Sequence, residues 1–100
     1  MKIHQSAIAL EANGTHGRYL YRFEDGSEAE LTFFERPEGL VTIDHTETPV
    51  KHRGQRVAEA ILTRAVGDFR ARGKKVIPAC PYAYKRFRQH PEWADVLHRS

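Results

Sequence analysis

Between residues 45 and 58 the sequence reads HTETPVKHRGQRVA, and this basic stretch joins two different hydrophobic patterns. Before it, apolar and polar residues alternate with a period of two, which is typical of a strand with one buried face. After it, Val57, Ile61, Ala65 and Phe69 recur at every fourth residue, which is typical of an amphipathic helix. The stretch therefore predicts a loop that carries the chain from a sheet into its longest helix.

Three segments before this loop have the strand pattern. The first centres on Tyr19, Tyr21 and Phe23, the second covers residues 28–35, and the third covers residues 40–47. Turn residues such as Asp25-Gly26 and Pro37-Glu38-Gly39 separate them, so they predict an antiparallel meander. Residues 5–12 form either a further strand or a short helix. On the third segment, alternation places His45 on the same buried face as Val41 and Ile43.

The helix after the loop is expected to end at Gly73, which suits a C-terminal cap. Residues 75–79 are then a short strand, and Pro78 places it at a sheet edge because proline cannot donate to a ladder. Pro81 suits the first turn of a second helix that runs to about Gln89. The resulting order, β-β-β-α-β-α, predicts an α+β domain with a mixed sheet, in which the last strand returns beside the third.

Composition limits the classes of protein that this chain can be. Its 100 residues, 40% hydrophobic and 29% charged, fit a single domain over residues 1–100. Because no apolar run approaches the roughly 18 residues of a membrane span and no signal core is present, we expect a cytoplasmic protein without membrane contact. The lone Cys80 excludes an internal disulfide, and the scattered histidines lack zinc-motif spacing, so no metal site is expected.

The loop lacks a capping side chain where the long helix begins. Neither Arg53 nor Gly54 is a Ser, Thr, Asp or Asn, so backbone N–H groups of the first turn are left without an acceptor. Gly54 allows a ligand to approach the backbone closely, the helix dipole favours an anion, and Lys51, Arg53 and Arg56 add positive charge. These features indicate a cradle for a diphosphate; the alternative is a solvated basic turn.

Three blocks of sequence carry a resemblance to a known family. HTETPVKHRGQRVA, VIPACPY and HPEWADVL resemble the small single-domain branch of the GNAT N-acetyltransferases, over roughly residues 19–98. The resemblance implies a GNAT-like sheet with a splayed pair of parallel strands that makes the acetyl pocket, and acetyl-CoA as co-substrate. It also implies that the strand before the loop binds pantetheine through its backbone, while the turn into the helix holds the pyrophosphate of coenzyme A.

On this resemblance the residues expected to bind the coenzyme are Thr46, Lys51, Arg53, Gly54, Gln55, Arg56, Val57, Ala58, Tyr82 and Tyr84. The sequence departs from the family pattern at two of them. Lys51 stands where the pattern has Gln or Arg, and Arg56 stands where it has a second small residue. The Arg56 side chain either narrows the approach of the pyrophosphate or points outward and pairs with phosphate.

Three side chains are candidates for the chemistry. His45 and Glu47 project from one face of their strand near its end, and Cys80 ends the strand expected beside it. The resemblance implies that His45 and Cys80 belong to the active site. Either Cys80 takes the acetyl group covalently with His45 as base, or His45 or Glu47 deprotonates the amine for direct transfer. The structural alternatives are a buried Cys80, a hydrogen-bonded His45 and a Glu47 that solvates the strand end.

The predicted function is therefore acetyl-CoA-dependent acetylation of an amine that the sequence does not identify. Because so short a chain lacks extra helices to build an acceptor pocket, the acceptor site is expected to be either open or completed by a second copy or a protein partner. One alternative is a coenzyme A-binding protein without transfer activity. Another is a nucleic-acid-binding module built on the basic, aromatic residues 82–88, which the net charge of only +3 disfavours.

Overall fold

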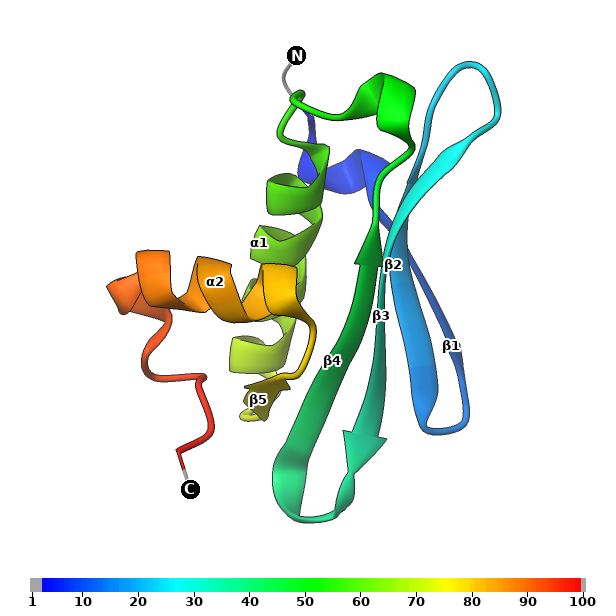
Figure 1. Cartoon of the computed structure of the whole chain (residues 1–100). Coiled ribbons are helices and arrows are strands. Elements are labelled where there is room, and N and C mark those ends of the chain that lie inside the picture. The colour runs from blue at the N-terminus through cyan, green and yellow to red at the C-terminus, as the bar shows by residue number, and fades with distance from the viewer. Residues whose placement is uncertain (1–2, 100) are drawn as a thin grey trace.

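A computed structural model describes residues 3–99, which form one five-stranded mixed sheet with two helices (Figure 1). The strands lie in chain order, as β1 (Ala9–Asn13), β2 (His16–Arg22), β3 (Glu28–Arg36), β4 (Leu40–Glu47) and β5 (Lys75–Pro78). The helices are α1 (Val57–Ala71) and α2 (Pro81–Gln89). Strands β1 to β4 are antiparallel and β5 is parallel to β4, which confirms the predicted α+β class and the return of the last strand beside β4.

The expected elements are found with small differences in their bounds. Residues 5–12 contain both alternatives, since a 3₁₀ turn at Gln5–Ala7 precedes strand β1. Strand β5 closes one edge of the sheet as its proline predicts, and Val76 bonds outward, to the backbone of Val96 and His98. Gly73 ends the long helix with φ +69°, as the capping argument requires. Within residues 3–99, neither helix is long and apolar enough to cross a membrane.

Helix α1 packs against one face of the sheet, over β2, β3 and β5. The core between them consists of fully buried side chains, with the rings of Phe33 and Phe69 in edge contact at 5.2 Å. Tyr19 is also buried there, and its hydroxyl donates to Asp68 Oδ2 at 2.8 Å. Burial raises the pKa of the Tyr19 hydroxyl well above its ordinary value, and the Asp68 carboxylate adds to that rise. Helix α1 is therefore fixed on the sheet along its length.

A bulge in β4 changes which side chains face α1. Thr32 pairs with His45, but its neighbour Phe33 pairs with Ile43, so Asp44 is an extra residue in β4. Up to Ile43 every second residue of β4 faces α1. Beyond the bulge the alternation is shifted by one residue, so the side chains that would have faced α1 lie on the opposite face. The expectation that His45 shares the buried face of Ile43 is therefore wrong: the His45 side chain is 51% exposed on the opposite face.

Candidate functional site

The chain turns from β4 into α1 through backbone conformations that are rare for most residues. A 3₁₀ turn at Val50–His52 is followed by Gly54 at φ +87° and by Arg56 at φ 62°, ψ 22°, both in the left-handed region. Helix α1 then begins at Val57, and Ala60 N–H donates the first helical bond, to Arg56 O at 3.1 Å. A left-handed residue followed by a helical one makes successive N–H groups converge, which is the geometry of an anion-binding nest.

The backbone donors of this turn have no acceptor in the part of the chain that the structure describes. None of the N–H groups of residues 54–59 donates to a backbone or side-chain atom within residues 3–99, and Arg56 makes no capping bond. The predicted uncapped helix start is thus confirmed. These six donors lie at the positive end of the α1 dipole, a combination that favours an anion.

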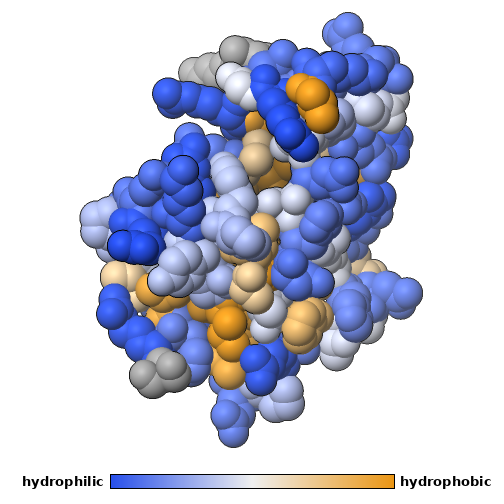
Figure 2. Space-filling model, viewed as in Figure 1, coloured by the Kyte–Doolittle hydropathy of each residue, from blue (hydrophilic) through white to orange (hydrophobic). Residues whose placement is uncertain are grey.

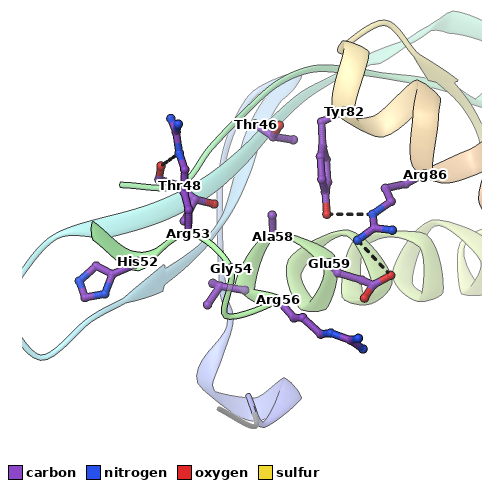
Figure 3. Close-up of a pocket in the computed structure, with 11 residues that line it drawn as sticks. Thr46, Thr48, His52, Arg53, Gly54, Arg56, Ala58, Glu59, Tyr82 and Arg86 are labelled. Atoms are coloured by element: carbon purple, nitrogen blue, oxygen red, sulfur yellow. Dashed lines mark hydrogen bonds and ion pairs between the residues drawn. The ribbon is translucent and has the colours of Figure 1, made fainter. Parts of the chain in front are cut away.

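A cavity of about 320 Å³ lies beside these donors (Figure 3). Its walls come from the end of β4, the loop, the first turn of α1 and helix α2. Figure 3 shows Thr46 and Tyr82 on opposite sides of the space above Ala58, while the Arg56 side chain runs away from that space, past Glu59. The lining residues are Thr46, Thr48, His52, Arg53, Gly54, Arg56, Val57, Ala58, Glu59, Tyr82 and Arg86.

The turn between β2 and β3 fastens the loop in place. Asp25 Oδ2 lies 2.9 Å from His52 Nε2 and 2.7 Å from Lys51 Nζ, and the His52 ring stacks on Phe23 at 3.7 Å between centroids. The Lys51 ammonium, with Ser27 and His52, holds the pKa of the Asp25 carboxyl far below its usual range. Lys51 therefore pairs with Asp25 and does not line the cavity, where it was expected to meet the coenzyme.

Helix α2 contributes a different set of residues from the one expected. Arg86 Nε donates to Tyr82 Oη at 3.3 Å, and Arg86 also lies 3.6 Å from the Glu59 carboxylate of α1. His90 Nε2 contacts the same carboxylate at 3.2 Å, so Glu59 joins the two helices. Sequence reasoning did not place Arg86 or Glu59 at the site, although the spacing of Tyr82 and Arg86, one helical turn apart, was a usable signal.

Tyr84 lies away from the cavity. It is 55% exposed, with the Arg88 guanidinium 5.9 Å above its ring. It lines a separate hollow of about 510 Å³ between α2, β5 and the C-terminal residues, and Figure 2 shows hydrophobic side chains below α2 on the face in view. Tyr82 is thus the tyrosine of α2 that faces the expected coenzyme site, and Tyr84 is not.

Strands β4 and β5 part where Cys80 lies. Their pairing ends at Ile43 and Pro78, and the N–H groups of Ala79 and Cys80 both donate to Ile43 O, at 3.0 and 3.1 Å. Beyond Ile43 the β4 edge on this side has no ladder partner within residues 3–99, which confirms the predicted splay. Cys80 is 5% exposed, and its Sγ lies 3.3 Å from Thr46 Oγ1.

His45 and Glu47 lie together, but on the face of β4 opposite to Thr46. His45 Nε2 is 3.4 Å from Glu47 Oε1, and Glu30 of β3 brings a second carboxylate into the group. One ligand atom from each of the three lies within 4.8 Å of the others, a grouping that the spacing of the sequence did not indicate. His45, Glu47 and Cys80 were expected to converge. Instead, strand β4 separates His45 and Glu47 from Cys80.

Comparison with known proteins identifies the family. Residues 18–96 match the family described as GCN5-related N-acetyl-transferase, which is most of the chain. The chain belongs to the GCN5-related N-acetyltransferase family. The resemblance stated from the three sequence blocks is thus confirmed, and the enzyme class with it. A search of curated proteins gave no match.

Solved structures share the fold of this GCN5-related N-acetyltransferase. The solution structure of a GCN5-like protein from Staphylococcus aureus, assigned as an N-acetyltransferase, superposes with a TM-score of 0.68 at 20% identity, covering 95% of this chain and 92% of that one. A crystal structure of ribosomal-protein-alanine N-acetyltransferase from Brucella melitensis biovar Abortus 2308 gives a TM-score of 0.59 at 18% identity, covering 86% of this chain and 65% of that one. At these identities the likeness establishes the fold alone.

Proposed function

We propose that this protein transfers the acetyl group of acetyl-CoA to an amine, with the coenzyme bound in the cavity beside α1. The observation that carries the proposal is the row of N–H groups of residues 54–59, which have no acceptor within residues 3–99 and lie beside a cavity that all of these residues except Gln55 line. Converging amides at a helix N-terminus fit a diphosphate, because each oxygen can accept a bond while the dipole offsets the negative charge. Gly54, Gln55, Val57 and Ala58 would hold it through their backbone, and Arg53 stands at the cavity wall.

The splayed end of β4 provides the next part of the coenzyme site. Backbone groups on the β4 edge beyond Ile43 are free to pair with the amides of a pantetheine arm, as an added strand would. Thr46 and Tyr82 would then flank the thioester end of that arm. The cavity leads from the phosphate-binding turn to this point without a break in its lining, so one extended ligand can occupy both.

The chemistry requires a proton acceptor on the amine side and a proton donor on the thiol side. The amine nitrogen attacks the thioester carbonyl carbon, the C–N bond forms, and the C–S bond breaks with its electron pair on sulfur. His45 would accept the proton of the amine, and the Glu47 carboxylate, whose Oε1 lies 3.4 Å from His45 Nε2, would stabilise the imidazolium that forms. Tyr82 accepts a bond from Arg86, so its own hydroxyl proton is free to pass to the leaving sulfur.

The covalent route through Cys80 has less support. Within residues 3–99, the polar contact of Cys80 Sγ is with Thr46, and no imidazole or carboxylate contacts it to draw off its proton. Direct transfer is therefore the route that we propose. Intact mass spectrometry after incubation with acetyl-CoA should show no added acetyl group on the wild type; labelling that disappears in Cys80→Ser would instead support the covalent route.

Thermal unfolding with and without acetyl-CoA tests the coenzyme site. A ligand at about 100 times its Kd adds about 2.7 kcal/mol, which raises Tm by roughly 10 °C or more in a domain of this size. Gly54→Glu should abolish the rise because it places a carboxylate among the phosphate donors. Gly39→Glu is the matched control, since Gly39 also has a positive φ, at +75°, with open space around it, but lies outside the cavity. A wild type without any rise, or a Gly54→Glu protein that keeps it, would refute the proposed site.

A further inference from the structure

The hollow between α2, β5 and the C-terminal residues is distinct from the coenzyme site. It measures about 510 Å³ and shares no lining residue with the cavity beside α1. Tyr82 and Tyr84, two residues apart on α2, face the two spaces separately. A hollow of this size on the surface of so small a domain is large enough to receive side chains of another molecule.

The walls of this hollow are mainly apolar. Ile77 and Pro78 of β5 and Leu97 near the end of the chain are half-buried, and Ala94 is exposed. Tyr84 adds an aromatic ring that is 55% exposed. Figure 2 shows hydrophobic side chains below α2 with hydrophilic ones around them. An apolar patch with a polar border is typical of a surface that binds another protein.

The charged side chains that line the hollow are all basic. Arg88 of α2 and Arg99 line it together with His90 and His98, and none of its lining residues is Asp or Glu. The positive charge therefore surrounds the apolar walls without a carboxylate among them. A ligand that carries negative charge beside an apolar group complements this surface.

The two carboxylates of the neighbouring turn are held outside the hollow. Glu92 Oε2 lies 2.8 Å from His90 Nδ1, and Asp95 Oδ2 accepts a bond from Arg70 Nε of α1 at 2.8 Å. Neither Glu92 nor Asp95 lines the hollow. These contacts direct the acidic groups of the turn elsewhere, so the basic character of the hollow is preserved.

Two other occupants fit this surface less well. A second copy bound symmetrically would place the same patch against itself, which brings Arg88 and Arg99 of the two copies together. A single-stranded nucleic acid stacks its bases on exposed rings, but the Arg88 guanidinium lies 5.9 Å above the ring of Tyr84. The aliphatic walls at Ile77 and Leu97 also offer nothing to a sugar-phosphate chain.

We propose that this hollow is a docking site for a partner protein, which binds through a segment that combines apolar side chains with Asp or Glu. An apolar side chain of that segment would pack against Ile77 and Leu97, and its carboxylates would pair with Arg88 and Arg99. Pairing of β5 with β4 ends at Pro78, which lines the hollow, so the partner would lie next to the splayed strands. The docking site goes beyond the proposed function and does not depend on it.

Selection from a displayed library of short random peptides tests the proposal. The wild type should enrich peptides that combine Leu, Ile or Phe with Asp or Glu. Ala94→Glu should retain few of them, because it places a carboxylate among the apolar walls. Ala71→Glu is the matched control, since Ala71 is also exposed but lies at the end of α1, outside the hollow. Enrichment of basic or uncharged peptides, or equal recovery on Ala94→Glu, would overturn the proposal.

Fluorescence anisotropy with the most enriched peptide then tests the role of charge. Arg88→Glu should weaken binding at least about tenfold, because it turns an attraction into a repulsion. Arg36→Glu reverses an exposed charge at the end of β3, outside the hollow, and should leave binding unchanged. Equal affinities of the wild type and Arg88→Glu would contradict the proposed pairing, and displacement of the peptide by oligouridylate would assign the hollow to nucleic acid instead. Neither experiment uses acetyl-CoA, so their failure would leave the coenzyme site standing.

Discussion

The two faces of β4 beyond Ile43 have surroundings of opposite charge. On one face Thr46 borders a cavity whose charged lining residues are Arg53, Arg56 and Arg86 together with a single carboxylate. On the other face His45 lies close to the carboxylates of Glu30 and Glu47. Strand β4 thus separates a basic surface, which suits phosphate, from an acidic surface, which suits a cationic amine.

This difference depends on the bulge at Asp44. Without the extra residue, strict alternation would turn His45 toward α1 and Thr46 to the open face, and neither surface would have its present composition. The bulge also coincides with the point at which β4 and β5 part. A single irregularity therefore decides which side chains of β4 border the cavity and which lie beside Glu30.

The largest expected effect is on stability, and it differs between the two faces of β3. Phe33 and Phe34 are consecutive residues of β3, one in the core against Phe69 and the other half-buried beside His16. Phe33→Ala should lower the free energy of unfolding by about 3–5 kcal/mol, because it leaves a cavity under α1. Phe34→Ala should cost about 1 kcal/mol. Urea unfolding measures both, and equal losses would show that the two faces of β3 are buried alike.

The next effect separates the two faces of β4 in catalysis. His45→Gln should lower kcat about 10²- to 10⁴-fold and leave the KM for acetyl-CoA nearly unchanged, because it removes a base on the amine side. Thr46→Val, at the adjacent residue, should instead raise the KM for acetyl-CoA about fivefold with little change in kcat. Release of coenzyme A with a panel of peptide amines and polyamines measures both. A raised KM for acetyl-CoA in His45→Gln, with a lowered kcat in Thr46→Val, would contradict the assignment of the two faces of β4.

The smallest effect is a pH dependence on the cavity side, where Glu59 links α1 to α2. The carboxylates of Glu92 and Glu59 raise the pKa of His90 above its ordinary value. Since the folded state then holds the proton more tightly, this stabilisation is present below the unfolded pKa and is lost as pH rises through the folded pKa. The wild type should therefore exceed His90→Gln in unfolding free energy by more at pH 5 than at pH 9, by under about 1 kcal/mol. If the difference in unfolding free energy between the two proteins did not change with pH, the carboxylates would not stabilise the protonated His90.

Local pattern was sufficient for most of the fold. The periods of two and about four residues placed β3, β4 and helix α1, because one buried face forces that spacing on any strand or helix. Pro81 placed the start of α2. Pro78 and Gly73 marked an edge strand and a helix end for equally local reasons, a missing N–H and a positive φ. The uncapped turn at Gly54 was predictable in the same way, since capping depends on the residue types at a few adjacent positions.

The composition of the site was not predictable, because it depends on which distant segments meet. Asp25 reaches Lys51 and His52 from another turn, and Glu59 reaches Arg86 from another helix. The hydrophobic periodicity of the sequence does not indicate such pairs. The face on which His45 and Thr46 lie was decided by the pairing of β4 with β3, where one extra residue fits against the partner strand. The sequence by itself determined the elements, their order and the open donors at α1; only the tertiary structure decided the faces of β4, because a bulge is a property of two paired strands.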